Sequence, residues 1–158
     1  MKILGAWSGH DCSYSVIDEG RPVVHDEYER FIREKEPSGD SLGFFLENYP
    51  NMLDEIDHIA TCFPNSKLEH YSESYRKVMN AVESRGGNIF TIGHHKSHAA
   101  NAFFSSNVEE ATILTFDGGG VEEDNVVTAC TIWLGRENKI DHIHTFPMPF
   151  VNIGGVWT

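Results

Sequence analysis

The sequence predicts a mixed α/β fold, and three observations lead to this prediction. Short apolar or alternating segments, typical of strands, interchange with segments that have the 3.6-residue period of amphipathic helices. A polar segment containing glycine and aspartate follows the first strand and recurs far along the chain. The same order of strand, polar loop, strand, tight turn and strand therefore occurs twice, beginning near Ile3 and again near Thr112. Such a repeat indicates two related lobes.

The first copy of this unit occupies the amino-terminal segment. Strands are predicted over residues 3–8, 13–17 and 22–26, because each is a short apolar or alternating run bounded by turn residues. The polar loop 8–13 joins the first two strands, and the tight turn 18–21 joins the second strand to the third.

Helices and strands then alternate. The expected elements are a helix over 41–48, a strand over 56–63, a helix over 66–84, a strand over 88–92 and a helix over 94–104. Either Ser38 or Asp40 is expected to cap the first helix, because both side chains accept hydrogen bonds from free helical N–H groups. Gly86 and Gly87 are expected to end the long helix, since glycine readily adopts the left-handed conformation found after helix ends.

The second copy of the unit starts near Thr112. Its strands are predicted over 112–116, 126–134 and 139–146. A loop, Asp117-Gly118-Gly119-Gly120, follows the first of them, and a turn over 135–138 precedes the third.

This duplication resembles the actin/hexokinase/Hsp70-like (ribonuclease H-like) architecture, in which two lobes hold a nucleotide between their Gly/Asp loops. We expect residues 1–108 to form the first lobe and residues 109–158 the first three strands of the second. Residues 150–158 have the pattern of the start of a further segment and not of the end of a domain, so we expect the rest of the second lobe to be missing.

The composition limits the possible partners. The chain has 12 Lys and Arg residues against 24 Asp and Glu residues, a net charge of −12. This charge argues against nucleic acids and anionic membranes, because a phosphate-rich surface requires clustered cations. The longest apolar stretches, such as 111–116, are far shorter than the ~20 residues of a spanning helix. Three widely spaced cysteines and the lack of a leader pattern predict a reduced, cytoplasmic protein.

Three residues predict a divalent-metal site. His94 and His98 lie four residues apart, so their imidazoles share one face of the predicted helix. Asp117 follows a predicted strand, at the edge where α/β sheets bind their ligands. A histidine pair alone is equally well a polar helix start, and Asp-Gly alone an ordinary turn, but the combination favours a metal. Two histidines and a carboxylate with open positions are typical of iron(II) and also suit zinc or manganese.

Two loops could also contact a substrate. The glycines after the aspartate allow the backbone to approach an anion closely. They are Gly118, Gly119 and Gly120. In the first loop, His10 and Asp11 place a base and a carboxylate at a strand end, where the alternative is an ordinary capped turn.

The segment 27–35 is densely charged. A charge run is often only a solvated surface. The alternative is that Arg30, Arg33 or Lys35 holds a phosphate or carboxylate of the substrate, because both side-chain types bind such anions.

Four motifs together resemble the carbamoyltransferase family of the nodulation protein U and the tobramycin and cephamycin O-carbamoyltransferase type. They are Gly9-His10-Asp11-Cys12-Ser13, Glu27-Tyr28-Glu29-Arg30-Phe31 with Arg33 and Lys35, His94-His95-Lys96-Ser97-His98-Ala99-Ala100, and Asp117-Gly118-Gly119-Gly120. Their order and spacing match the family over nearly the whole chain. Cys12 and Tyr28 depart from the family's usual Ala and Glu, and we expect these changes to alter the acceptor side.

The resemblance implies a two-step reaction. A carboxyl-terminal domain of the family makes carbamoyl-adenylate from carbamoyl phosphate and ATP, and the amino-terminal domain passes the carbamoyl group to an acceptor hydroxyl. The metal would be held by His94, His98 and Asp117; iron(II) is expected, with zinc, manganese or magnesium as alternatives. His10 is the expected base, and Asp11 is expected either to orient it or to contact the metal shell. The adenylate-forming domain and a further metal-binding aspartate of the family are absent, so we expect the chain alone to be inactive.

Two other interpretations stay open. An actin-like-fold kinase would bind Mg-ATP with the loops of Asp11 and Asp117, but it has no need of the histidine pair. A truncated, non-catalytic remnant would bind metal without turnover. The sequence does not identify the acceptor. We also expect a homo-oligomer, because the strands between 126 and 146 are apolar on both faces and one edge is left unpaired.

Overall fold

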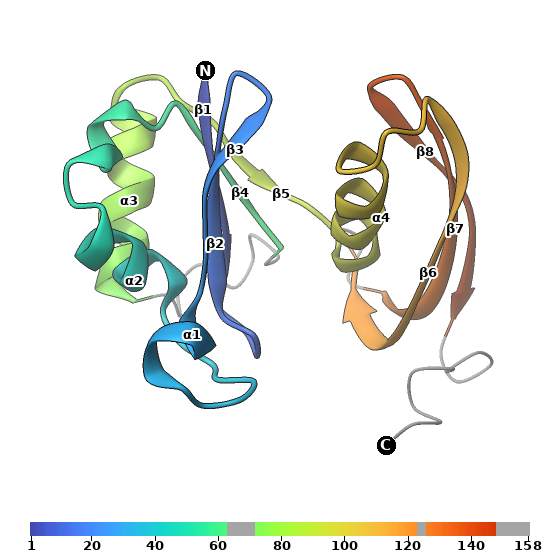
Figure 1. Cartoon of the computed structure of the whole chain (residues 1–158), viewed down its shortest axis with the longest axis horizontal. Helices are drawn as coiled ribbons and strands as arrows, with labels where there is room; N and C mark the ends of the chain where they lie inside the picture. Colours follow the sequence, from blue (N-terminus) through green and yellow to red (C-terminus); the bar gives the residue numbers. More distant parts are fainter. Residues whose placement is uncertain (63–71, 123–125, 148–158) are drawn as a thin grey trace. The chain divides into compact units, whose positions relative to one another are not determined.

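The computed structural model describes residues 1–62, 72–122 and 126–147. The chain divides into two compact units, Met1–Thr91 and Ile92–Thr158. Each unit has a sheet of its own (Figure 1). Among the helices of the described residues, none has the length and apolar character that crossing a membrane requires.

The first unit is built on a five-stranded mixed sheet with the strand order β3-β2-β1-β4-β5. The strands are β1 (Lys2–Trp7), β2 (Ser13–Asp18), β3 (Arg21–Glu27), β4 (His58–Thr61) and β5 (Ile89–Thr91). The first three form an antiparallel meander, whereas β4 pairs in parallel with both β1 and β5. Parallel neighbours need crossover connections, and helical segments supply them here.

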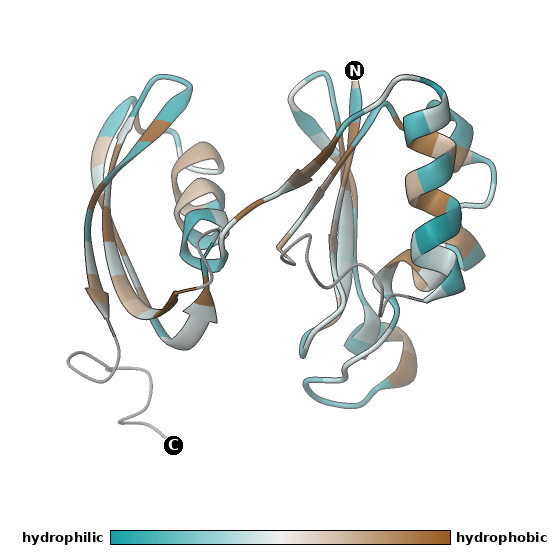
Figure 2. Ribbon diagram, turned by 180° about the vertical axis from the view of Figure 1, so that it is seen from behind, coloured by the Kyte–Doolittle hydropathy of each residue, from teal (hydrophilic) through white to brown (hydrophobic). Residues whose placement is uncertain are grey.

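Two helices, α2 (Ser41–Asn48) and α3 (Glu73–Ser84), cover one face of this sheet (Figure 1). A short helix, α1 (Tyr28–Ile32), follows β3, and a 3₁₀ helix, η1 (Met52–Glu55), precedes β4. The strands under the helices carry the hydrophobic segments visible in Figure 2. Helix α3 buries one stripe of side chains, which has the spacing of an amphipathic helix. The stripe consists of Tyr75, Val78, Met79 and Val82.

The ends of these helices follow from local hydrogen bonds. Of the two capping residues considered, Asp40 caps α2 by accepting a 2.9 Å bond from the Gly43 N–H. Ser72 is the N-cap residue of α3, and its side chain accepts a hydrogen bond from the Tyr75 N–H. The predicted helix began at residue 66, and residues 66–71 lie outside the described residues.

The described residues of the second unit form one helix on a three-stranded antiparallel sheet (Figure 1). Its elements are α4 (His94–Phe104), β6 (Glu110–Val121), β7 (Val127–Arg136) and β8 (Lys139–Pro147). The helix packs on β6 and β7 through a core of Ala99, Phe103, Ile113 and Trp133. Gly135 permits this close approach, because a Cβ there would lie 2.6 Å from the Phe103 ring.

The predicted repeat is present in the strand pairing. In both units three consecutive strands form an antiparallel meander, and a two-residue turn joins the second strand to the third. The first turn places Glu19 and Gly20 at φ 48° and 77°, and the second places Glu137 at φ 51°. Positive φ matches the twist of the flanking strands, so both turns continue the sheet without splaying it.

Two features differ from the sequence analysis. Residues 117–120 do not form a loop but lie within β6, which is longer than predicted. Phe116 pairs with Cys130 and Gly120 with Thr128, so residues 117–119 stand opposite Ala129 alone and form a bulge. The compact units also divide before α4 and not after residue 108, because α4 packs on the second sheet.

Candidate metal centre

Three predicted ligands come together within the second unit. His94 and His98 lie one turn apart on α4, with ring centroids 4.7 Å apart, and Asp117 lies in the bulge of β6. One ligand atom from each residue falls within 4.8 Å of the other two. The bulge matters here, because it re-aims the chain where a regular strand would alternate its side chains.

The separations of these atoms suit a common ion. The Nε2 atoms of His94 and His98 are 3.1 Å apart, and His98 Nε2 is 3.5 Å from Asp117 Oδ2. Ligands about 2.1 Å from one ion lie roughly 3.0–3.4 Å from each other in octahedral or tetrahedral geometry. His94 Nε2 and Asp117 Oδ2 are in direct hydrogen-bond contact. The nitrogen and oxygen donors therefore fit a divalent transition metal such as iron(II) or zinc.

The carboxylate of Asp117 is held in one orientation. Its Oδ1 accepts a 2.5 Å hydrogen bond from the Gly118 N–H, and its Oδ2 faces the two imidazoles. His94 is mostly buried and Asp117 partly buried, whereas the His98 side chain is 56% exposed. The centre is thus open to solvent on the His98 side, where further ligands could bind.

Gly120 makes room for His94. A Cβ at residue 120 would lie 2.2 Å from His94 Cδ2 and 2.3 Å from Cγ, so the imidazole rests on the bare backbone. Nothing lies within 4 Å of a Cβ built at Gly118. The glycines therefore differ in role, and at residue 120 the structure gives a packing reason for glycine.

The start of α4 is fixed from outside the helix. Its N-cap residue is Gly93, which has no side chain to accept a hydrogen bond. Glu122, to which the sequence analysis gave no role, accepts a 2.8 Å bond from the His95 N–H instead. A Cβ at Gly93 would lie 2.1 Å from Glu122 Oε2, so carboxylate and backbone pack without a gap.

The pKa values of two ligands lie below their ordinary values. Burial and the neighbouring His94 lower the pKa of His98. Partial burial alone would raise the pKa of Asp117, but hydrogen bonds from His94 and the Gly118 N–H lower it by more than burial raises it. Both shifts favour the unprotonated forms that bind metals.

These shifts predict a loss of stability in acid for the metal-free protein. Between about pH 6.5 and the lower folded-state pKa of His98, the unfolded chain binds more protons, so stability falls as the pH falls. Asp117 adds to this loss only below about pH 4, where its unfolded form takes up a proton. Urea unfolding from pH 7 to pH 5 in EDTA measures the effect. His98→Gln should give a shallower dependence, and equal slopes for the two proteins would contradict the assignment.

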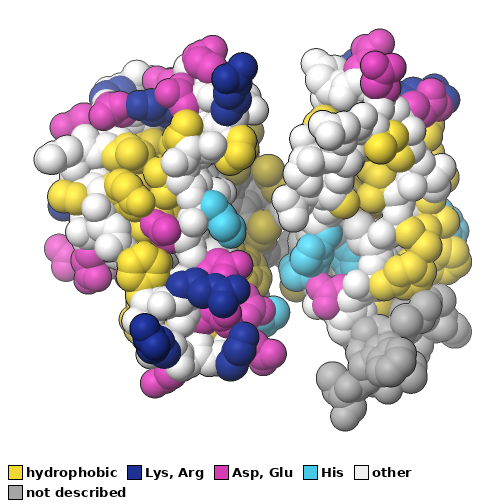
Figure 3. All heavy atoms as spheres, in the orientation of Figure 1, with side chains coloured by type: hydrophobic (Ala, Val, Ile, Leu, Met, Phe, Trp, Pro, Cys, Tyr) yellow, Lys and Arg dark blue, Asp and Glu magenta, His cyan; other side chains and the backbone are white. Residues whose placement is uncertain are grey.

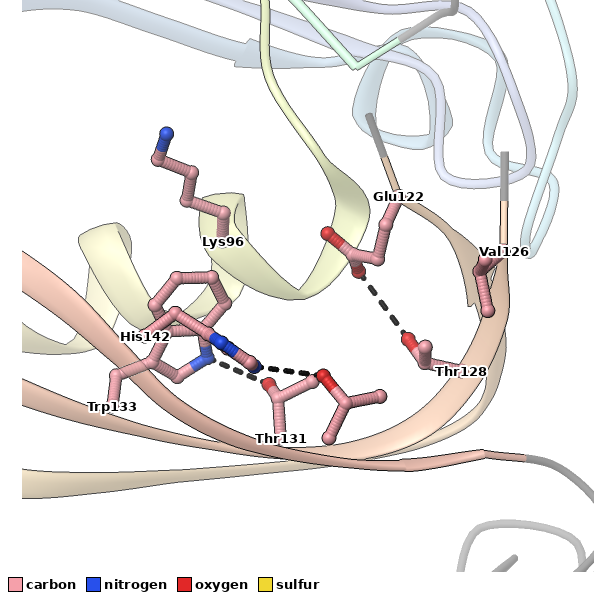
Figure 4. Close-up of a pocket in the computed structure, with 8 residues that line it drawn as sticks. Lys96, Glu122, Val126, Thr128, Thr131, Trp133 and His142 are labelled. Carbon is pink, nitrogen blue, oxygen red and sulfur yellow. Dashed lines mark hydrogen bonds between the residues drawn. The ribbon is translucent and has the colours of Figure 1, made fainter. Parts of the chain in front are cut away.

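A cavity of about 400 Å³ lies beside α4 in the same unit (Figure 4). Lys96, Glu122, Trp133 and His142 are among its lining residues. Lys96 is two residues from each ligand histidine, which places it on the opposite side of the helix. The cavity therefore does not open onto the metal ligands.

His10 and Asp11 lie in the first unit, in the loop between β1 and β2. His10 Nδ1 is 2.7 Å from Asp11 Oδ2, both side chains are exposed, and Asp11 has φ 57°. The indole of Trp7 folds over Gly9, where a Cβ would lie 2.2 Å from the ring, and its Nε1–H donates to the His10 carbonyl. This loop presents an oriented imidazole to solvent.

The two departures from the family motifs are packing residues. Cys12 is buried, and burial, aided by the charge of Asp40, raises the pKa of its thiol to about 11. A thiol with this pKa stays protonated at neutral pH. The Tyr28 ring packs edge-on against Phe44 at 5.0 Å.

The charged segment shows intermingled cations and carboxylates over α1 (Figure 3). Arg30 donates a 2.8 Å hydrogen bond to Glu27, and Lys35 lies 3.5 Å from Glu29, which also faces Arg30 at 3.6 Å. A hollow of about 260 Å³ lies here, and it is lined by Glu29, Arg30, Arg33, Glu34 and Lys35. An anion entering it would compete with Glu27 and Glu29 for the cations.

Comparisons with known proteins add to this description. No family model matches the chain. The nodulation protein NolNO of Sinorhizobium fredii (strain NBRC 101917 / NGR234) is 28% identical over 161 residues, which cover 87% of this chain and 23% of NolNO. The chain thus spans less than a quarter of the length of this relative.

Solved structures resemble the chain in fold. Full-length HypF in its phosphate- and nucleotide-bound form matches 90% of this chain and 18% of its own, with a TM-score of 0.58 and 13% identity. The match to T. kodakarensis HypF covers 85% of this chain and 17% of HypF, with a TM-score of 0.57 and 14% identity. The match to YeaZ from Pseudomonas aeruginosa covers 97% of this chain and 72% of YeaZ, with a TM-score of 0.50 and 13% identity.

These likenesses bear on two predictions. The mixed sheet and its similarity to HypF and YeaZ confirm the predicted actin-like fold class. The match to NolNO extends over 87% of the chain. The chain thus resembles the nodulation protein NolNO in sequence and HypF in fold, and its four motifs resemble those of the carbamoyltransferase family.

Proposed function

We propose that the chain is the carbamoyl-transfer part of an O-carbamoyltransferase, which moves a carbamoyl group from carbamoyl-adenylate to an acceptor hydroxyl. The observation that carries the proposal is the convergence of His94, His98 and Asp117 at ligand distances in a chain related to this family. A divalent metal held by these residues would supply a Lewis acid for the carbonyl of the adenylate. The motif of two histidines and a carboxylate favours iron(II) as this metal. Zinc, manganese and magnesium are the alternatives.

The proposed transfer has simple atom accounting. The acceptor oxygen bonds to the carbamoyl carbon, the bond from that carbon to the adenylate oxygen breaks, and AMP leaves. We assign the acceptor's proton to His10 as general base. The 2.7 Å contact of His10 Nδ1 with Asp11 supports this role, because a carboxylate at Nδ1 leaves Nε2 free to accept a proton.

The remaining assignments concern the adenylate and its origin. We propose that Arg30 and Lys35 contact its phosphate, and that the backbone at Gly118–Gly120 borders its binding site. ATP and carbamoyl phosphate would be used by another part of the full-length protein, since the chain covers 23% of NolNO. We place the reaction in the cytoplasm, where the cysteines would stay reduced.

The alternatives are weaker on the same observations. An actin-like-fold kinase would need only Mg-ATP at the loops of Asp11 and Asp117, and gives no reason for two imidazoles beside Asp117. A non-catalytic remnant would keep the metal site without turnover, and only an assay separates it from the proposed enzyme.

The test supplies carbamoyl-adenylate directly, so that no adenylate-forming activity is needed. The protein is loaded with iron(II) without oxygen, and AMP release is followed with glycerol, glucosamine or an aminoglycoside as acceptor. The inactivity expected of the chain alone concerns the complete two-step reaction. With the adenylate supplied, we expect acceptor-dependent release, and this release should fall roughly 10²- to 10⁴-fold in His10→Ala, the usual contribution of a general base. His25→Ala, an exposed histidine on β3, is the control. Tight metal binding with AMP release at the protein-free rate would favour the remnant.

A further inference from the structure

His95 lies between the two ligand histidines in sequence but points the other way. Its side chain is fully buried between α4 and the sheet. The Nδ1 atom is 2.7 Å from Thr115 Oγ1, and the Nε2 atom is 3.0 Å from the Thr128 carbonyl oxygen. A carbonyl oxygen only accepts, so Nε2 carries the hydrogen and Nδ1 accepts from the Thr115 hydroxyl.

The hydrogen bonds continue into the sheet. Thr115 Oγ1 and Thr131 Oγ1 are 2.5 Å apart, and the Trp133 Nε1–H donates to Thr131 Oγ1 over 2.6 Å, as Figure 4 shows. Because the Thr115 proton is used at His95, the Thr131 hydroxyl must donate to Thr115. The direction of every bond from Trp133 to the Thr128 carbonyl is thereby fixed, and all four side chains are buried.

The main chain of His95 is held as well. Its N–H donates to Glu122 Oε1, which also lies 3.4 Å from Thr128 Oγ1. A helix turns by about 100° per residue, so fixing one residue at both ring and backbone fixes the rotation of its neighbours. His94 and His98 belong to the same first turns of α4, and Asp117 lies on β6, to which Thr115 also belongs.

We infer that His95 is the positioning residue of the metal centre, locked in its Nε2–H form by Thr115 and the Thr128 carbonyl so that α4 presents His94 and His98 to Asp117. The inference rests on the proposed metal site. A histidine that only filled the core would stabilise the fold. Loss of its hydrogen bonds would then weaken metal binding only as far as it weakens the fold.

The test separates these two roles. Zinc affinity is measured by chelator competition for the wild type, His95→Leu, Thr115→Val and Thr115→Ser, with the free energy of unfolding of each. Phe103→Leu is the matched control, because it weakens the same core outside the hydrogen-bonded chain. We expect His95→Leu and Thr115→Val to bind zinc roughly 10- to 100-fold more weakly, as for other outer-shell partners. Thr115→Ser, which keeps the hydroxyl, should bind like the wild type.

A second readout needs no metal. In ¹⁵N NMR of the metal-free wild type, His95 should show one tautomer, protonated at Nε2, and His94 and His98 single sets of ring signals. Thr115→Val should split or broaden the His94 and His98 signals, and Thr115→Ser should not. An Nδ1–H tautomer, or zinc affinities that follow stability alone as in Phe103→Leu, would overturn the inference. A wild type that binds no zinc would instead defeat the proposed function, and the NMR comparison would still decide the role of His95.

Discussion

The His98→Ala protein is expected to lose metal binding. His98 supplies one of three ligand atoms within 4.8 Å of each other, and its removal leaves His94 and Asp117, which can then satisfy each other through their direct hydrogen bond. The loss should exceed the roughly 10- to 100-fold that removal of an outer-shell partner costs. Elemental analysis and titration with zinc or iron(II) measure it.

The control for this experiment is His144→Ala, because His144 is an exposed histidine of the same unit with no part in the cluster. The wild type should bind one equivalent and release it readily to a chelator, since only three protein ligands are present among the described residues. Equal metal content in the wild type and His98→Ala would refute the site.

The second large effect is expected from Gly120→Ala. The added methyl group would meet the His94 ring at 2.2–2.3 Å, and the ring cannot move without leaving Asp117. We expect weaker metal binding and a loss of about 1–3 kcal/mol in the free energy of unfolding, the usual cost of overpacking. Chemical denaturation and metal titration report the two effects separately.

Gly118→Ala is the matched control. It lies in the same bulge, has no atom within 4 Å of the new methyl group, and, like Gly120, shows no positive φ. Any effect that comes only from replacing glycine by alanine, without the contact to His94, would therefore appear in both variants. If the two proteins bind metal equally well, the close contact at residue 120 has no bearing on the site.

Much of this site was open to prediction because its signals are local. The spacing of His94 and His98 places both on one helix face whatever the rest of the fold does. The alternation of apolar residues before Asp117 indicates a strand, so the carboxylate was expected near its end. The helix caps and tight turns depend on near neighbours too, and Asp40 and Gly20 are at the expected positions.

The parts that were not predicted depend on distant residues. The bulge at 117–119 exists only in register with β7, and the register depends on pairing across the hairpin. For the same reason the packing of Gly120 against His94 was not predicted. The role of His95 escaped notice because its partners Thr115 and Thr131 come from two strands. Their hydroxyls inside apolar strands were the available signal.

Some expectations stay predictions. The expected homo-oligomer is one; Leu114 and Phe116 are exposed on β6, and sedimentation measures the association state. The roles of His10, Asp11, Arg30 and Lys35 toward a substrate depend on the assay above. Short helix α1 was not predicted, since its five residues lie in a charged segment that has no clear helical period.

The location of His94, His98 and Asp117 in one compact unit has a consequence for metal acquisition. Among the described residues, none of 1–62 and 72–91 belongs to the three-ligand cluster, so an ion can bind to the second unit by itself. A protease cut between Thr91 and Ile92 would leave the three ligands on a single fragment.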